Sequence, residues 1–115
     1  MNLKQKRYYF GLFAEKIACF YLNIKLYQIL AKRYKTPFGE IDIIAKKGNE
    51  IVFIEVKARK ETDLMDFISK HQQQRINKAA QYFLLRFPKY QAYNLRFDAI
   101  IMNRHFLPKH FISYW

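Results

Sequence analysis

The sequence predicts an α/β fold, in which a mixed central sheet of four to five strands is flanked by helices. Apolar residues recur at three- and four-residue spacing in two segments, which is typical of amphipathic helices. Between these segments, two stretches rich in Ile and Val are joined by the turn pair Gly48-Asn49, which is typical of a strand hairpin. The 115 residues include three Gly and three Pro and no repeat or linker, so we expect one domain spanning residues 1–115.

The predicted elements follow one another as a helix, three strands, a second helix, and one or two further strands. The second helix is expected to end near Pro88, because proline cannot continue a helix. The last segment contains Pro108 and is expected to be a short edge element. The expected helices cover residues 6–23 and 65–86, and the expected strands cover residues 27–34, 41–46, 51–58, 93–102 and 106–114.

The composition is typical of a folded protein that binds a polyanion. Half of the residues are apolar, and 21 Lys and Arg against nine Asp and Glu give a formal charge of +12. This charge favours a polyanion as a partner, such as nucleic acid or an anionic membrane face, and a basic surface without a specific ligand is the alternative. Cys19 is the one cysteine, which excludes an intrachain disulfide and a cysteine-rich zinc site and favours a cytoplasmic location. No uncharged apolar stretch approaches the roughly 20 residues of a membrane helix. No expected helix pairs a strong apolar face with a Lys/Arg-rich one, as helices that dock on membranes do, so we expect no membrane partner.

The two best strand candidates carry charges where half-buried positions are expected. If the residues that flank the turn pair with each other, the same register places Asp42 opposite Glu55 and Glu40 opposite Lys57. Directly opposed side chains have Cβ atoms roughly 4.5 to 5.5 Å apart. Since side chains alternate between the faces of a strand, the turn brings Asp42, Glu55 and Lys57 to one face of the sheet.

Two carboxylates at that distance repel each other, and three arrangements would compensate. A divalent cation such as Mg²⁺ takes oxygen ligands, commonly one or two carboxylates. Alternatively, one carboxyl carries a proton and has a raised pKa. In the third arrangement Lys46, Lys57 or Arg59 neutralises the pair within a solvated lattice of ion pairs. The residues around Glu55 are apolar on both faces, as in a central strand, where a charge is costly unless it is paired or coordinated.

Glu15 interrupts the apolar pattern of the first helix. It shares a side of that helix with Ala18, Cys19 and Leu22, so an inward orientation is one alternative. The spacing alone favours the other alternative, an exposed glutamate beside Lys16.

Several motifs together resemble a known family. Asp42 followed after a hairpin by Glu55-Val56-Lys57 resembles the signature of the PD-(D/E)XK nuclease superfamily. The blocks "GEIDIIA", "VFIEVKAR" and "RFDAI", preceded by "GLFAEKIACFYL", resemble the YraN-like proteins, small bacterial relatives of archaeal Holliday-junction resolvases. The resemblance covers residues 11–101 in the order of the family, and it implies a restriction-endonuclease-like core.

The resemblance implies a catalytic site and a reaction. Asp42 and Glu55 match metal-binding carboxylates, the backbone carbonyl of Val56 matches a further ligand, and Glu15 matches a helix-borne acid of the metal site. Lys57 matches the lysine that positions or activates the attacking water. The implied cofactor is Mg²⁺ or Mn²⁺, and the implied reaction is metal-assisted hydrolysis of phosphodiesters in branched or structured DNA. The alternative is a nucleic-acid-binding module that keeps the nuclease fold without catalysis. Resolvase-like relatives act as dimers, so a homodimer is an alternative to a monomer by analogy.

The sequence departs from the pattern of the superfamily and of the family at three places. Ile41 stands in place of a proline, Gln72 stands in place of a helix lysine, and the glycine often found between the third strand and the second helix is missing. Phosphate contacts are expected from a groove around the acidic site. An internal ion pair is expected between Arg96 and Asp98, and the three histidines are expected to be solvated or to take packing roles. The residues expected to contact nucleic acid are Arg33, Lys35, Arg59, Lys60, Lys70, Gln72 and Arg75.

Overall fold

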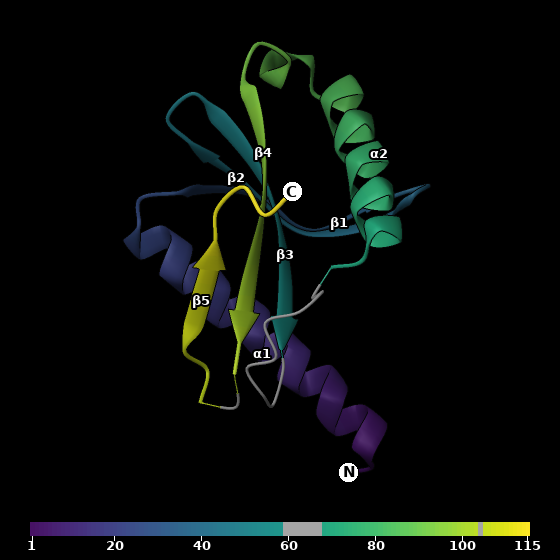
Figure 1. The fold of residues 1–115 in the computed structure, drawn as a ribbon, viewed down its shortest axis with the longest axis vertical. Coiled ribbons are helices and arrows are strands. Elements are labelled where there is room, and N and C mark those ends of the chain that lie inside the picture. The colour runs from purple at the N-terminus through teal and green to yellow at the C-terminus, as the bar shows by residue number, and fades with distance from the viewer. Residues whose placement is uncertain (59–67, 104) are drawn as a thin grey trace.

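The computed structural model describes residues 1–58, 68–103 and 105–115. Within these residues the predicted α/β fold is confirmed, since a five-stranded sheet is flanked by two helices in the order α-β-β-β-α-β-β (Figure 1). A short 3₁₀ helix, η1, follows the second helix. The elements are α1 Leu3–Ile24, β1 Gln28–Thr36, β2 Gly39–Lys47, β3 Glu50–Ala58, α2 Lys70–Arg86, η1 Pro88–Tyr90, β4 Asn94–Met102 and β5 Pro108–Phe111.

The sheet has the strand order β1-β2-β3-β4-β5, with β3 in the middle. β3 runs parallel to β4, and the other neighbours are antiparallel, so the sheet is mixed as predicted. Lys47 pairs with Glu50 across the Gly48-Asn49 turn, as the sequence predicts. Gly48 has a φ of 59°, the left-handed conformation that glycine adopts without steric cost. The restriction-endonuclease-like arrangement follows from this hairpin and from the parallel pairing of β3 with β4 across α2.

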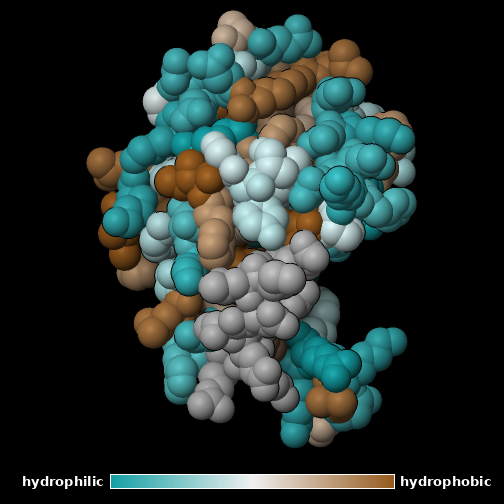
Figure 2. All heavy atoms as spheres, viewed as in Figure 1, coloured by the Kyte–Doolittle hydropathy of each residue, from teal (hydrophilic) through white to brown (hydrophobic). Residues whose placement is uncertain are grey.

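The two helices cover opposite faces of the sheet. On one face α1 buries Ala14, Ala18 and Leu22 against residues such as Ile54 and Ile100. On the other face α2 buries an apolar side that includes Ile76, Ala80 and Phe83. Figure 1 shows α1 crossing behind the sheet, with its N-terminal half extending past the strands. Figure 2 shows a mainly hydrophilic surface over α2, so its apolar side is turned inward.

Each helix differs in detail from the prediction. In α1 the residues with no exposed surface are small or lie late in the helix, whereas Phe13, Phe20 and Ile24 are at least half exposed. The helix α2 begins at Lys70, because the side chain of Ser69 accepts a hydrogen bond from the backbone of Gln72 and caps the helix. The predicted start at residue 65 lies outside the described residues, and the extension through residue 69 is wrong. No helix in the described ranges is both long and apolar enough to cross a membrane.

An ion-pair network around the buried Asp98 joins strands β3, β4 and β5. Arg96 donates to Asp98 at 2.8 Å and to Glu50 at 2.8 Å, which confirms the predicted internal pair. The expectation for His110 is wrong in one respect, because its Nε2 lies 2.7 Å from Oδ2 of Asp98 and the ring belongs to this network. Asp98 has no exposed surface. Burial raises the pKa of Asp98, but hydrogen bonds from His110, Arg96 and the backbone of Ser113 outweigh burial and hold that pKa below its usual value.

Candidate functional site

The alternation of side chains between the two faces of the sheet is broken in β2 at Asp42. Ile41 and Ile44 pack on the α2 face, whereas Ile43 packs on the α1 face. Regular alternation would place Ile41 and Ile43 on the same face. The neighbouring strand is irregular at the same level, since Arg33 has a φ of 51°. Such a break re-aims a side chain, as bulges do, and the side chain at the break is Asp42.

Asp42 lies where the hairpin ladder stops. The predicted register continues from the turn to the pair Ile43 and Ile54. Beyond that pair, Oδ2 of Asp42 accepts a hydrogen bond from the backbone N–H of Val56 at 2.8 Å. The carboxylate therefore joins β2 to β3 beside Glu55. Burial raises the pKa of Asp42, and the hydrogen bond from Val56 offsets only part of this effect.

Glu55 on β3 is the buried acid of the site. Its residue surface is 5% exposed, and its Oε1 is buried without a hydrogen-bond donor among the described residues. Burial, together with the charge of Asp42, raises the pKa of Glu55 to about 8. A proton shared with Asp42, or a cation, would satisfy this oxygen. A raised pKa is what the protonated-carboxyl alternative requires of one acid of the pair.

Lys57 lies next to Glu55, with Nζ 3.8 Å from Oε2. The predicted pairing of Glu40 with Lys57 is wrong. Glu40 lies opposite Lys35 on β1, and its Oε1 is 3.9 Å from Nε of Arg33. The difference arises because the β2–β3 ladder ends before Glu40, so the strand partner of Glu40 is β1 alone.

Glu15 faces the same site from α1. The side chain is half-buried, and Nε of Arg33 donates a hydrogen bond to Oε1 of Glu15 at 3.1 Å. Burial raises the pKa of Glu15, and the charge of Asp42 raises it further. Glu15 and Asp42 also line one pocket of about 330 Å³. The spacing-based interpretation of Glu15 as an exposed surface residue is therefore wrong.

The donors present fit a divalent cation that is shared with a substrate. In the described part of the chain, no three or more His, Cys, Asp and Glu side chains form a group that could hold a metal ion. Asp42 and Glu55 do lie close together, since each carboxyl alters the pKa of the other. Mg²⁺ is commonly held by one or two carboxylates, with water and phosphate oxygens completing its shell. The unpartnered oxygen of Glu55 is therefore a suitable ligand for such an ion.

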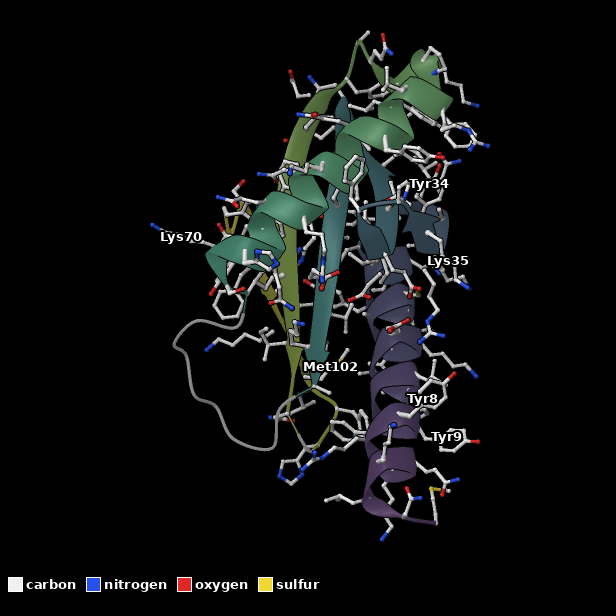
Figure 3. All side chains as sticks on the ribbon, turned by 90° about the vertical axis from the view of Figure 1, so that its right-hand side faces the viewer. Tyr8, Tyr9, Tyr34, Lys35, Lys70 and Met102 are labelled. Atoms are coloured by element: carbon white, nitrogen blue, oxygen red, sulfur yellow. The ribbon has the colours of Figure 1, made fainter. Side chains whose placement is uncertain are left out.

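The expected nucleic-acid contacts lie in several places. Arg33 is at the acidic site, and Figure 3 shows Lys35 and Lys70 on opposite sides of the view. Gln72 is engaged in capping α2, since its side chain accepts from the backbone of Ser69. Arg75 is exposed and covers the start of β2, because a Cβ on Gly39 would lie 2.9 Å from its Cδ. The remaining two candidates, Arg59 and Lys60, lie outside the described residues.

Sequence reasoning missed one contact of the site, between Tyr8 and Arg33. A hydrogen bond with the Tyr8 hydroxyl is the largest cause of the raised pKa of Arg33. Tyr8 and Glu15 are seven residues apart, two turns of α1, so they lie on the same side of the helix. That spacing is the signal in the sequence that could have placed Tyr8 beside Glu15. The position of Arg33 next to them depends on tertiary structure.

Comparisons with known proteins agree with the resemblance in the motifs. The model of UPF0102, described as an uncharacterised protein family, matches residues 14–102. A UPF0102 protein of Nitrobacter winogradskyi is 43% identical over 90% of this chain and 88% of its own length. UPF0102 proteins of Bradyrhizobium diazoefficiens and Rhodopseudomonas palustris are each 47% identical over 90% of this chain, and the matches cover 78% and 80% of their lengths. The chain therefore belongs to the UPF0102 family, the YraN family that its motifs resemble.

Proposed function

We propose that the protein is a metal-dependent endonuclease that hydrolyses phosphodiesters in branched or structured DNA. The observation that supports this most is Oε1 of Glu55, which is buried beside Asp42, close to Lys57, and has no hydrogen-bond donor among the described residues. A buried acceptor without a donor costs about 1 to 3 kcal/mol, and proteins avoid such atoms unless the site has another use. A bound cation would satisfy the oxygen and remove the repulsion between the two carboxylates.

The residues of the site have distinct proposed roles. Asp42, Glu55 and the backbone carbonyl of Val56 would hold one Mg²⁺ or Mn²⁺ ion, and Glu15 is proposed as an additional acid once its pair with Arg33 opens. The bound ion would supply a water of lowered pKa and would offset the charge that develops on the phosphate. The hydrogen bond from Val56 fixes Asp42 before any ligand binds, so these oxygens are preorganised.

Lys57 is the cation proposed to act on the reacting groups. Nζ of Lys57 lies 3.8 Å from Oε2 of Glu55, which places the three N–H donors of the ammonium beside the buried acid. From there Lys57 would orient the attacking water or donate to a non-bridging phosphate oxygen as negative charge develops.

The substrate class follows from charge. A formal charge of +12 attracts a polyanion, whereas binding a small anionic metabolite does not require so large a charge. Arg33 and Lys35 on β1, Lys70 and Arg75 on α2, and also Arg59, Lys60 and Gln72 are proposed to contact phosphates. We propose branched or structured DNA as the form, by analogy with the resolvase-like relatives.

A second candidate is a nucleic-acid-binding module without catalysis. It is favoured by the absence of a group of three metal-binding side chains among the described residues. In that case the carboxyl pair keeps its shared proton, and binding does not depend on a metal.

Cleavage assays separate the two candidates. Labelled four-way junction, flap and linear duplex DNA would be incubated with the protein in EDTA, Mg²⁺ or Mn²⁺. The nuclease proposal predicts metal-dependent nicking that is abolished in Asp42→Asn. Glu40→Gln is the matched control, because Glu40 is two residues away on the same strand, exposed, and outside the carboxyl pair. Metal-independent binding without nicking, or equal nicking by Asp42→Asn, would contradict the nuclease proposal.

A further inference from the structure

Nothing among the described residues requires a glycine at position 11 of α1. Its φ is not among the positive values, and a Cβ at this position would meet no atom within 4 Å in the described part of the chain. Glycine inside a helix is destabilising relative to alanine, because it gives up more backbone entropy on folding. The two other glycines have positive φ angles, so they differ from Gly11 in this respect. As far as the described residues go, the space above Gly11 is therefore open, and the glycine there lowers the stability of the helix.

That open space belongs to a pocket of about 740 Å³ between the first half of α1 and the end of β3. Lys57 lines the pocket and is also 3.8 Å from Glu55, so the pocket is directly adjacent to the proposed catalytic pair. Phe10, Val56 and Ala58 contribute apolar surface, and Lys6 and Arg7 contribute positive charge. No acidic residue is among the described residues that line it. Pockets of this size take small organic groups, and the charge favours an anionic one.

An aromatic ring lines the pocket. Phe10 is half-buried, and its ring packs against Phe106 with the centroids 4.8 Å apart. By contrast, Figure 3 shows Tyr8 and Tyr9 pointing outward from α1. Among these three aromatic residues, only Phe10 lines this pocket. An aromatic ring beside cationic side chains is the arrangement on which proteins stack unpaired bases.

We propose that this pocket takes an unpaired nucleobase of the substrate strand, next to the phosphodiester that is cut. The base stacks on Phe10 over the open space at Gly11, while Lys6 and Arg7 contact the flanking phosphates. The proposal rests on the nuclease function and narrows its substrate to DNA that carries an unpaired nucleotide near the cut. A base inside a duplex would have to leave its stack to enter, which costs free energy.

Binding measurements in EDTA test the pocket separately from cleavage. Oligonucleotides would carry one 2-aminopurine, either fully paired in a duplex or in a single-nucleotide flap, and affinity and fluorescence would be followed together. The wild type is expected to bind the flap about tenfold more tightly than the duplex and to change the fluorescence of the flapped base. Phe10→Ala and Gly11→Leu are expected to reduce this preference to about twofold or less while duplex affinity stays unchanged.

Tyr9→Ala is the matched control, because it removes an exposed aromatic residue from the same helix outside this pocket. It should keep the preference for the flap. If Phe10→Ala does not fold, as judged by circular dichroism, Gly11→Leu still tests the pocket because it adds atoms only to open space. Equal binding of flap and duplex by the wild type, or an unchanged preference in Gly11→Leu, would overturn the proposal even if the protein cuts DNA. A preference lost in Gly11→Leu, combined with no cleavage in Mg²⁺, would support the pocket and overturn the nuclease function.

Discussion

Replacing Glu55 by glutamine tests the electrostatics of the site without any substrate. Folding raises the pKa of Glu55 from 4.5 to about 8, mainly through burial. The folded protein therefore binds a proton more tightly than the unfolded chain does. The contribution of Glu55 to the free energy of unfolding is fully present below pH 4.5 and is lost as the pH rises through about 8. Between pH 5 and pH 8 the loss amounts to about 3 kcal/mol, since each pKa unit is worth about 1.4 kcal/mol.

Glutamine resembles the protonated acid in shape and carries no charge. In the absence of metal, Glu55→Gln is expected to be more stable than the wild type at pH 8 by about 3 kcal/mol, and close to it at pH 5. Urea unfolding of both proteins across this range, in EDTA, measures the difference. Other groups titrate in both proteins, so the informative quantity is the difference between the two pH profiles.

Added Mg²⁺ should remove most of this difference at pH 8. An ion that binds only the folded wild type stabilises it by about 2.7 kcal/mol at 100 times its Kd, whereas the glutamine variant lacks the charge that holds the ion. Parallel pH profiles for the two proteins in EDTA would show that Glu55 titrates normally in the folded state. That result would refute the argument that burial and Asp42 perturb this acid.

Three further predictions concern other parts of the molecule. Gly11→Ala should raise the free energy of unfolding by about 0.5 to 1 kcal/mol, and a loss of stability in urea unfolding would show that the fold needs glycine there. Asp98→Asn should lower the free energy of unfolding by about 3 kcal/mol, because it removes the buried negative partner of the half-buried Arg96; a change below about 1 kcal/mol would contradict the network. Lys35→Ala should reduce the slope of log K against log salt concentration for DNA binding by about 1, and an unchanged slope would remove Lys35 from the phosphate contacts.

Local rules predicted the hairpin correctly. The two-residue turn Gly48-Asn49 fixes the pairing of Lys47 with Glu50, and each following pair depends on the one before it. The same rules placed Asp42, Glu55 and Lys57 in one neighbourhood. They did not predict that the ladder stops before Asp42, because that break depends on β1, where Arg33 takes a positive φ.

Contacts between distant segments account for what the sequence did not predict. Glu15 faces Asp42 because α1 packs through Ala14, Ala18 and Leu22, whereas the larger apolar residues of the helix suggested another side. His110 joins Asp98 across the β4–β5 pairing, which no local spacing indicates. The start of α2 was misplaced because the capping role of Ser69 was not recognised in the sequence.

Calorimetric titration of Mg²⁺ and Mn²⁺ into the wild type, Asp42→Asn and Glu40→Gln tests most directly the claim that the buried carboxyl pair is a metal site. We predict binding to the wild type and to Glu40→Gln and none to Asp42→Asn. Below pH 8, binding should release about one proton per ion, because the metal replaces the proton on Glu55. Absence of binding to the wild type, or equal binding to Asp42→Asn, would contradict the claim.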